Sequence, residues 1–193
     1  MLGLKLPTDP RWVNIAEKNI QEILTDHAFC EIKAASTAIS LMVSFPEYTE
    51  LVKEMPNLAK EEMCHFELVH NIILDRGWTL GRDRKDHYVI KLLSFFPKGG
   101  SRTTQLTHRL LYAALIEARS CERFKLLSEN LKDKELALFF RSLMESEAGH
   151  YTLFLNFARN YGDRKIVDEK WQKLLIFEAE IMKSLGSKET IHG

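Results

Sequence analysis

One arrangement of glutamate and histidine occurs twice in this chain of 193 residues. In each copy a single glutamate is followed, 31 residues later in the first and 30 in the second, by a Glu-x-x-His motif. The four segments that carry these residues have the periodicity of long α-helices. One glutamate from each of two helices, with Glu-x-x-His from each of two more, is the ligand set of a carboxylate di-metal site in a four-helix bundle. The six candidate metal ligands are Glu31, Glu62, His65, Glu117, Glu147 and His150.

Each candidate ligand interrupts the apolar face of its own segment. Glu31 shares a helical face with Leu24 and Ala34, and Glu147 shares one with Leu143. An ionised carboxylate buried without a partner is very costly, so four of them in one core require cations. Carboxylate and imidazole donors without thiolates favour iron or manganese over a structural zinc. We therefore expect two divalent metal ions.

The order of helical segments predicts an all-α protein with a single domain over residues 1–193. The expected architecture is a ferritin-like antiparallel four-helix bundle, because a long crossover separates the two copies of the repeat, where the parallel middle helices of such a bundle require it. The expected segments are helices over about 9–46, 47–77, 101–131 and 133–162, a crossover over about 77–101 and an additional C-terminal helix over about 163–185.

Three individual residues carry further expectations. Pro56 should interrupt or kink the second helix, since proline lacks the N–H that an interior helical position donates. Gly149 costs about 1 kcal/mol relative to alanine inside a helix, which suggests a close approach of another helix. His27, one turn before Glu31, is favoured as an ordinary core residue, with a role beside the metal or facing the substrate as alternatives.

Composition is that of an ordinary soluble globular protein, with 45% hydrophobic and 28% charged residues and a net charge of zero. No apolar run is long enough to cross a bilayer, so we expect a cytoplasmic protein that does not bind membranes. Three cysteines without a C-x-x-C motif argue against a disulfide framework and against a rubredoxin-type iron site. A monomer is favoured as the oligomeric state.

The ligand set also indicates a type of chemistry. A pair of ferrous ions in an apolar cavity is suited to binding and reducing O2, and apolar walls protect an oxidising species from water. Small side chains near the ligands would leave room for O2 and part of a substrate. These are Ala34, Ala35, Ala113, Ala114 and Ala118, although alanines equally allow close helix packing.

The runs around the ligands resemble those of the MiaE-type tRNA hydroxylases over nearly the whole chain. They are residues 26–31 (DHAFCE), 61–66 (EEMCHF), 117–124 (EARSCERF) and 146–151 (SEAGHY), of which EARSCER is the most specific. The resemblance implies a ferritin-like non-haem di-iron monooxygenase with two iron ions, O2 as co-substrate and an external electron donor. It also implies hydroxylation of the isopentenyl side chain of a hypermodified adenosine beside the tRNA anticodon, with the same six residues as iron ligands.

The resemblance gives the crossover an expected role in holding RNA. Eight basic side chains and only two acidic ones lie between Arg76 and Arg109. Arg and Lys contacts to phosphates would hold the anticodon stem-loop, and the second expected partner is an electron-transfer protein or reductase. The candidate phosphate contacts are Arg82, Arg84, Lys85, Lys98 and Arg102.

Three other functions are compatible with parts of the pattern. A ferritin-like iron store or ferroxidase would use the same ligands, although it needs no basic crossover. A rubrerythrin-type peroxidase is disfavoured by the missing rubredoxin cysteines. A helical binding module with purely structural Glu and His residues would bind no metal.

Overall fold

The computed structural model describes residues 2–186 and 190–192. These residues form helices and connecting segments, and no strand occurs among them, which confirms the all-α prediction. The chain divides into two compact units, Lys18–Lys85 and Met1–Glu17 together with Asp86–Gly193. In the described residues the helices are α1 (Trp12–Lys18), α2 (Ile20–Ser44), α3 (Thr49–Asp75), α4 (His87–Leu93), α5 (Arg102–Asn130), α6 (Lys134–Tyr161) and α7 (Arg164–Leu185).

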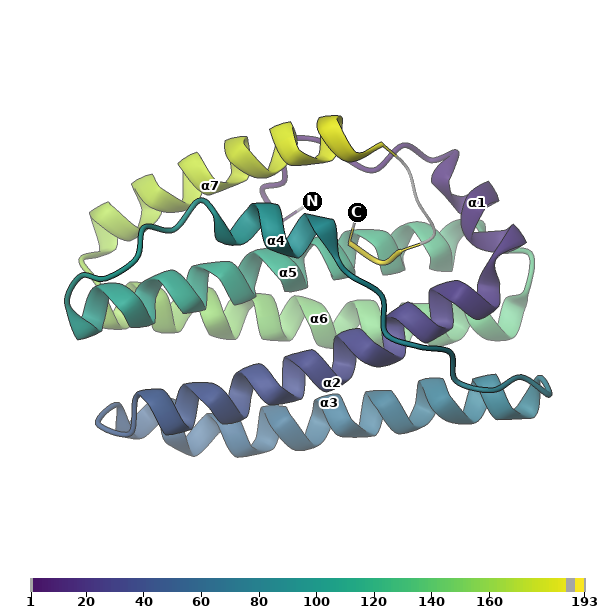
Figure 1. Cartoon of the computed structure of the whole chain (residues 1–193), viewed down its shortest axis with the longest axis horizontal. Helices are drawn as coiled ribbons and strands as arrows, with labels where there is room; N and C mark the ends of the chain where they lie inside the picture. The colour runs from purple at the N-terminus through teal and green to yellow at the C-terminus, as the bar shows by residue number, and fades with distance from the viewer. Residues whose placement is uncertain (1, 187–189, 193) are drawn as a thin grey trace. The chain divides into compact units, whose positions relative to one another are not determined.

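The unit Lys18–Lys85, called here the α2–α3 unit, is a helical hairpin (Figure 1). α2 and α3 pack along one another and are joined by a short turn. Gly77 ends α3 with φ +72°, and the N–H groups of Gly77 and Trp78 donate to Leu74 O at 2.8 Å and Ile73 O at 3.0 Å. Gly77 is therefore a glycine C-cap, because only glycine adopts the left-handed conformation without steric cost.

Two of the expected helix boundaries are wrong. α3 runs from Thr49 to Asp75 with Pro56 inside it, so the predicted interruption does not occur. Proline removes one backbone hydrogen bond there, and the buried side chains of Met55 and Leu58 hold the turn in place. The first predicted helix is instead two helices, because Asn19 leaves the helical region with φ −132° and ψ 37°.

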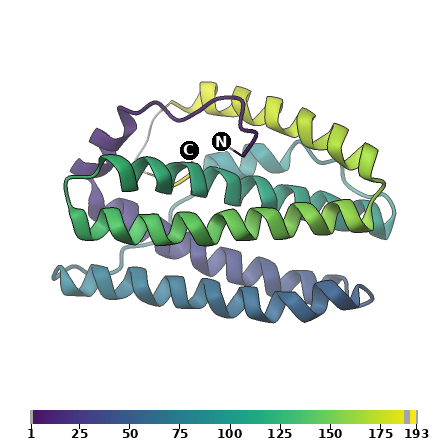
Figure 2. The ribbon, with the colours of Figure 1, turned by 180° about the vertical axis from the view of Figure 1, so that it is seen from behind.

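The other unit, called here the α5–α6 unit, consists of Met1–Glu17 and Asp86–Gly193. Its long helices α5 and α6 are antiparallel neighbours, and α7 packs against α4, α5 and α6 (Figures 1 and 2). α4 is a short helix inside the segment expected as a crossover, and α7 matches the expected C-terminal helix. Side-chain oxygens of Ser101, Asp133 and Asp163 accept backbone N–H groups at the starts of α5, α6 and α7.

A buried ion-pair network fixes the N-terminal segment and α7 to α5. The Arg119 guanidinium donates to Glu178 Oε1 from Nε at 2.9 Å and from Nη2 at 2.6 Å. It also donates to Glu122 Oε2 at 2.9 Å and to Leu6 O at 3.0 Å, so residues before α1 run beside α5 (Figure 2). Tyr88 donates to the same Glu178 oxygen at 3.2 Å, and burial raises the pKa of both groups.

Breaking this network should be costly because the remaining charge stays buried. We expect Arg119→Ala to lower the free energy of unfolding by about 3–5 kcal/mol. The double variant Arg119→Met/Glu178→Leu should recover part of that loss, since it buries no charge. Urea unfolding followed by circular dichroism measures both. A loss below about 1 kcal/mol in Arg119→Ala would contradict the structural role.

The close helix approach expected at Gly149 is also wrong, and this makes the position a candidate for stabilisation. A Cβ built on Gly149 meets no atom within 4 Å. Gly149→Ala should therefore raise the free energy of unfolding by about 1 kcal/mol, through the higher helix propensity of alanine. The measurement is thermal unfolding of the metal-free protein.

Gly162 supplies the opposite control. A Cβ there would lie 2.7 Å from Val167 Cγ2 and 3.1 Å from Ala158 O, so Gly162→Ala should lower the melting temperature. Equal behaviour of the two alanine variants would show that helix propensity and local space do not govern these sites.

Candidate metal centre

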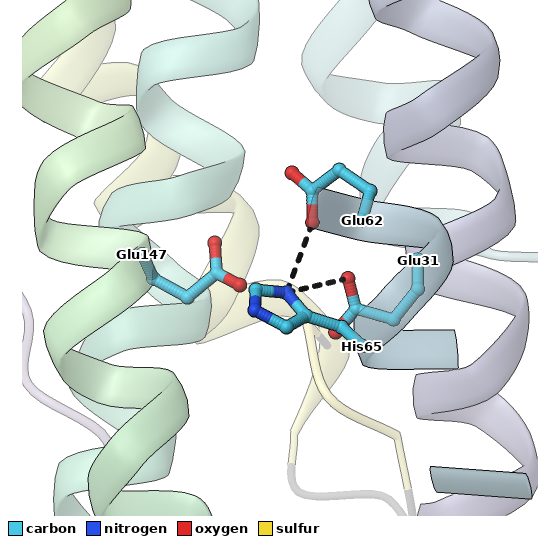
Figure 3. A group of neighbouring side chains, drawn as sticks. All are labelled: Glu31, Glu62, His65 and Glu147. Carbon is cyan, nitrogen blue, oxygen red and sulfur yellow. Dashed lines mark hydrogen bonds and ion pairs between the residues drawn. The ribbon is translucent and has the colours of Figure 1, made fainter. Parts of the chain in front are cut away.

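Three of the six candidate ligands meet inside the α2–α3 unit. Glu31 comes from α2, and Glu62 and His65 come from α3. His65 Nδ1 lies 3.2 Å from Glu62 Oε2 and 3.9 Å from Glu31 Oε2 (Figure 3). The exposed fractions of the three residues are only 4%, 1% and 8%. We call this cluster the α2–α3 half-site.

The other three candidate ligands meet inside the α5–α6 unit in the same way. Glu117 comes from α5, and Glu147 and His150 come from α6. His150 Nδ1 lies 3.5 Å from Glu147 Oε2, and one ligand atom from each of the three residues lies within 4.8 Å of the others. All three residues are buried. We call this cluster the α5–α6 half-site.

The two half-sites have the same composition because the same local geometry produces them. Residues three apart on a helix lie on one face, so each Glu-x-x-His motif directs a carboxylate and an imidazole to the same place. The packed neighbour helix adds the second carboxylate, from Glu31 in one unit and Glu117 in the other. Each unit thus brings together the three residues that the sequence predicted in it.

The donors in each half-site fit a divalent cation. Two buried carboxylates place two negative charges in a region that water does not solvate, and a divalent ion balances them. Carboxylate oxygen and imidazole nitrogen are ligands of iron, manganese and zinc sites. The cysteines that lie near these ligands in the sequence are too few in either unit to form a thiolate metal site. In the α5–α6 unit, Cys121 is buried. Burial raises the pKa of its thiol to about 12, so the thiol stays protonated.

His27 has a more specific place than the core position that the sequence favoured. Its ring is fully buried on α2, and Nε2 forms a hydrogen bond with Glu31 Oε1. A second residue that holds a ligand carboxylate fixes the orientation of that ligand. The four-residue spacing between His27 and Glu31 was the signal for this contact, since such pairs are neighbours on a helix face.

The five candidate phosphate contacts are divided between the units. Arg82, Arg84 and Lys85 end the α2–α3 unit, whereas Lys98 and Arg102 precede and begin α5. Arg84 Nη1 forms an ion pair with Glu22 Oε2 at 3.3 Å, so part of its charge is already compensated. The other four side chains are exposed.

Each of the two helix pairs buries the same cluster of carboxylates and an imidazole. This arrangement is typical of all-α proteins with carboxylate-type metal sites. No helix within the described residues is long and apolar enough to span a membrane. A family model described as tRNA-(MS[2]IO[6]A)-hydroxylase (MiaE) matches residues 2–193. The chain therefore belongs to the MiaE family of tRNA hydroxylases.

Individual relatives agree with this family. A tRNA 2-(methylsulfanyl)-N(6)-isopentenyladenosine(37) hydroxylase of Pseudomonas putida is 35% identical, over 98% of this chain and 91% of its own length. The enzyme of the same name from Salmonella typhimurium is 29% identical, over 81% of this chain and 75% of its own length. Among solved structures, "Protein 43 with aldehyde deformylating oxygenase activity from Synechococcus" superposes with a TM-score of 0.91. It is 32% identical, over 98% of this chain and 95% of its own.

The half-sites make a direct prediction about metal binding. His65→Ala and His150→Ala should each lower metal affinity at least about 100-fold. Loss of a residue that only hydrogen-bonds to a metal ligand typically lowers it by ~10–100-fold. His70→Ala is the matched control, because His70 lies on α3 but stacks on Phe66 at 5.7 Å and belongs to neither cluster. Metal content by mass spectrometry, with circular dichroism for helix content, gives the answer. Full metal occupancy in either ligand variant would refute the assignment.

Proposed function

We propose that this protein is an O2-dependent non-haem di-iron monooxygenase of tRNA. As a MiaE-family member it is a hydroxylase. Its substrate is the 2-methylthio-N6-isopentenyladenosine at position 37 beside the anticodon, the nucleoside in the names of both relatives. The reaction adds one oxygen atom to the isopentenyl side chain. The observation that carries the proposal is the matched pair of buried Glu/Glu/His half-sites in a chain of this family.

We further propose that the two half-sites belong to one di-metal centre. In this arrangement α2, α3, α5 and α6 form a ferritin-like antiparallel four-helix bundle within a single domain over residues 1–193. The crossover over about 77–101 joins its halves, and α7 is an additional helix. The support is the repeated spacing of the ligands, which matches the known recipe for such sites, and the likeness of the whole chain to an oxygenase.

Iron is the metal that best fits this proposal. The six ligands are Glu31, Glu62, His65, Glu117, Glu147 and His150, and their oxygen and nitrogen donors suit iron. Two bound iron ions would supply the binding and reduction of O2, with electrons from an external donor such as an electron-transfer protein or reductase.

The chain's own residues orient the ligands and exclude water. His27 holds one oxygen of Glu31 and thereby directs the other oxygen toward the cluster. Apolar side chains one turn from the ligands, including Ala28, Ala35 and Ala114, are buried and leave little room for water. A dry pocket strengthens electrostatic interactions and prevents side reactions of an oxidising species.

The RNA has to be held while one nucleoside enters the protein. A nucleoside that is stacked on its neighbours must leave the stack before the side chain on its base can reach a buried site. The basic side chains Arg82, Arg84, Lys85, Lys98 and Arg102 are proposed to contact phosphates of the anticodon stem-loop. A monomer is sufficient for this function, because one chain supplies all six ligands.

A mass analysis of tRNA nucleosides tests the function. Iron-loaded protein, a reductant and isotopically labelled O2 are incubated with tRNA that carries the isopentenyl modification. We expect one labelled oxygen on the modified adenosine, and about 100-fold less or none with Glu147→Ala, because the ligand set is incomplete. Unlabelled product would identify water as the oxygen source and refute the monooxygenase. No product from fully iron-loaded protein would refute the substrate.

The similarity to the Synechococcus protein supports a second candidate activity, aldehyde deformylation, since the identity of 32% extends over nearly both chains. The same iron-loaded preparation can be given an aliphatic aldehyde, O2 and reductant, with formate as the measured product. Formate release without tRNA oxidation would favour this second activity.

A further inference from the structure

Aromatic rings gather on one surface of the α5–α6 unit, where the end of α4 meets α7. Phe95 and Phe96 directly follow α4, and their ring centroids lie 5.2 Å apart. The ring of Phe95 also lies 5.3 Å from that of Phe177 on α7. All three side chains are half-buried, so each ring is held by its neighbours but keeps part of its surface in solvent. Rings held in this way are suited to stacking with a flat ligand.

A histidine and a lysine adjoin these rings. The Phe96 ring lies 5.2 Å from that of His108 on α5, and Lys170 Nζ on α7 forms a hydrogen bond with His108 Nε2. Burial and the charge of Lys173 lower the pKa of Lys170, and burial and the charge of Lys170 lower the pKa of His108. A lysine ammonium can only donate, so the His108 ring accepts in this contact. The like charges are those of Lys170 and Lys173, and a bound anion would relieve their repulsion.

The lysines and one of the rings lie on a single face of α7. Lys170, Lys173 and Phe177 are spaced at i, i+3 and i+7, which places them in one row. Lys173 is exposed and Lys170 is partly exposed, so both ammonium groups can be reached from solvent. The row continues onto the rings of Phe95 and Phe96 through the contact with Phe177.

Two of the four acidic residues of α7 are paired with arginines. Asp168 pairs with Arg159 at 2.7 Å, and Glu178 is buried against Arg119 at 2.6 Å. The two other acids of α7 are exposed at the edges of the row, one turn before Lys173 and one turn beyond Phe177. They are Glu169 and Glu180.

We propose that this surface binds single-stranded nucleotides of the tRNA anticodon loop, with bases on the aromatic rings and phosphates on the lysines. The proposal rests on the proposed function in tRNA modification. Aromatic side chains beside basic ones are the general design for holding unpaired RNA, because every base has a face that stacks. We call this surface the α4–α7 platform; its residues are Phe95, Phe96, His108, Lys170, Lys173 and Phe177.

The platform is separate from the α5–α6 half-site. His108 and Glu117 are both on α5, nine residues apart in sequence. At ~1.5 Å per residue and 3.6 residues per turn, this spacing puts them about 14 Å apart along the axis and on opposite sides of the helix. The platform therefore acts on RNA affinity and not on the chemical step, and its loss should raise KM without changing kcat at saturating RNA.

The lysines are tested by a matched pair of double variants. Lys170→Ala/Lys173→Ala removes the platform charges, whereas Lys165→Ala/Lys183→Ala removes two exposed charges from a different side of the same helix. Binding of a synthetic anticodon stem-loop RNA to metal-loaded protein is measured as a function of salt. The platform variant should bind the RNA at least about tenfold more weakly at low salt. Its plot of log affinity against log salt concentration should be less steep by about 1.4, or ~0.7 for each lysine removed. Equal losses in both variants, or none in the platform variant, would overturn the proposal.

Stacking is tested separately with Phe95→Leu/Phe96→Leu, which keeps the contacts with the helix apolar. RNA affinity should fall at least about fivefold with an unchanged salt slope, because stacking adds no ionic contact. An unchanged affinity would overturn the stacking part.

Two outcomes separate the platform from the proposed function. If wild-type protein hydroxylates the tRNA and the platform variants keep its KM, the platform is refuted and the function stands. If wild-type protein binds the RNA through the platform but adds no oxygen, the function is refuted and the platform stands.

Discussion

Burial of carboxylates inside helix pairs is the constraint on which the rest of this structure depends. Each unit places two glutamates and a histidine where water does not reach. Such a cluster is unfavourable by itself, since desolvation of an anion costs several kcal/mol even after relaxation. A divalent cation would compensate the buried negative charge, so metal binding would stabilise the folded state. The packed helix pairs α2–α3 and α5–α6 provide the frame that holds the donors close together before the ion arrives.

A second buried charge cluster stabilises the frame without belonging to the metal sites. Arg119 lies two residues after Glu117 on α5 and points to a different side, where it joins Glu178, Glu122 and the N-terminal segment. α5 is therefore fixed on one side by an ion pair and offers its ligand on another. The position of Glu117 depends in this way on residues from both ends of the chain.

The sequence predicted the parts of the structure that depend on local spacing. The Glu/His clusters followed from residues three apart on a helix. The helix starts expected near residues 133 and 163 lie at Asp133 and Asp163, whose side chains cap α6 and α7. Wrong expectations arose where tertiary packing overrides a local preference, as at Pro56, or where a glycine has empty space beside it, as at Gly149. The α4–α7 platform could not be predicted, because it depends on contacts between residues near the end of α4 and the start of α5 and a helix, α7, that lies far along the sequence.

The repeat that unites the two half-sites is imperfect at one position, and this has a chemical consequence. Glu31 has a histidine four residues before it that holds one carboxylate oxygen, but the equivalent position before Glu117 is Ala113. One carboxylate is thus oriented by a hydrogen bond, whereas alanine can offer none at the corresponding place. Two ions with the same ligand types would then differ in ligand basicity and rigidity. In the proposed di-metal centre, the two metal positions would then be distinguishable in their order of filling and in their spectra.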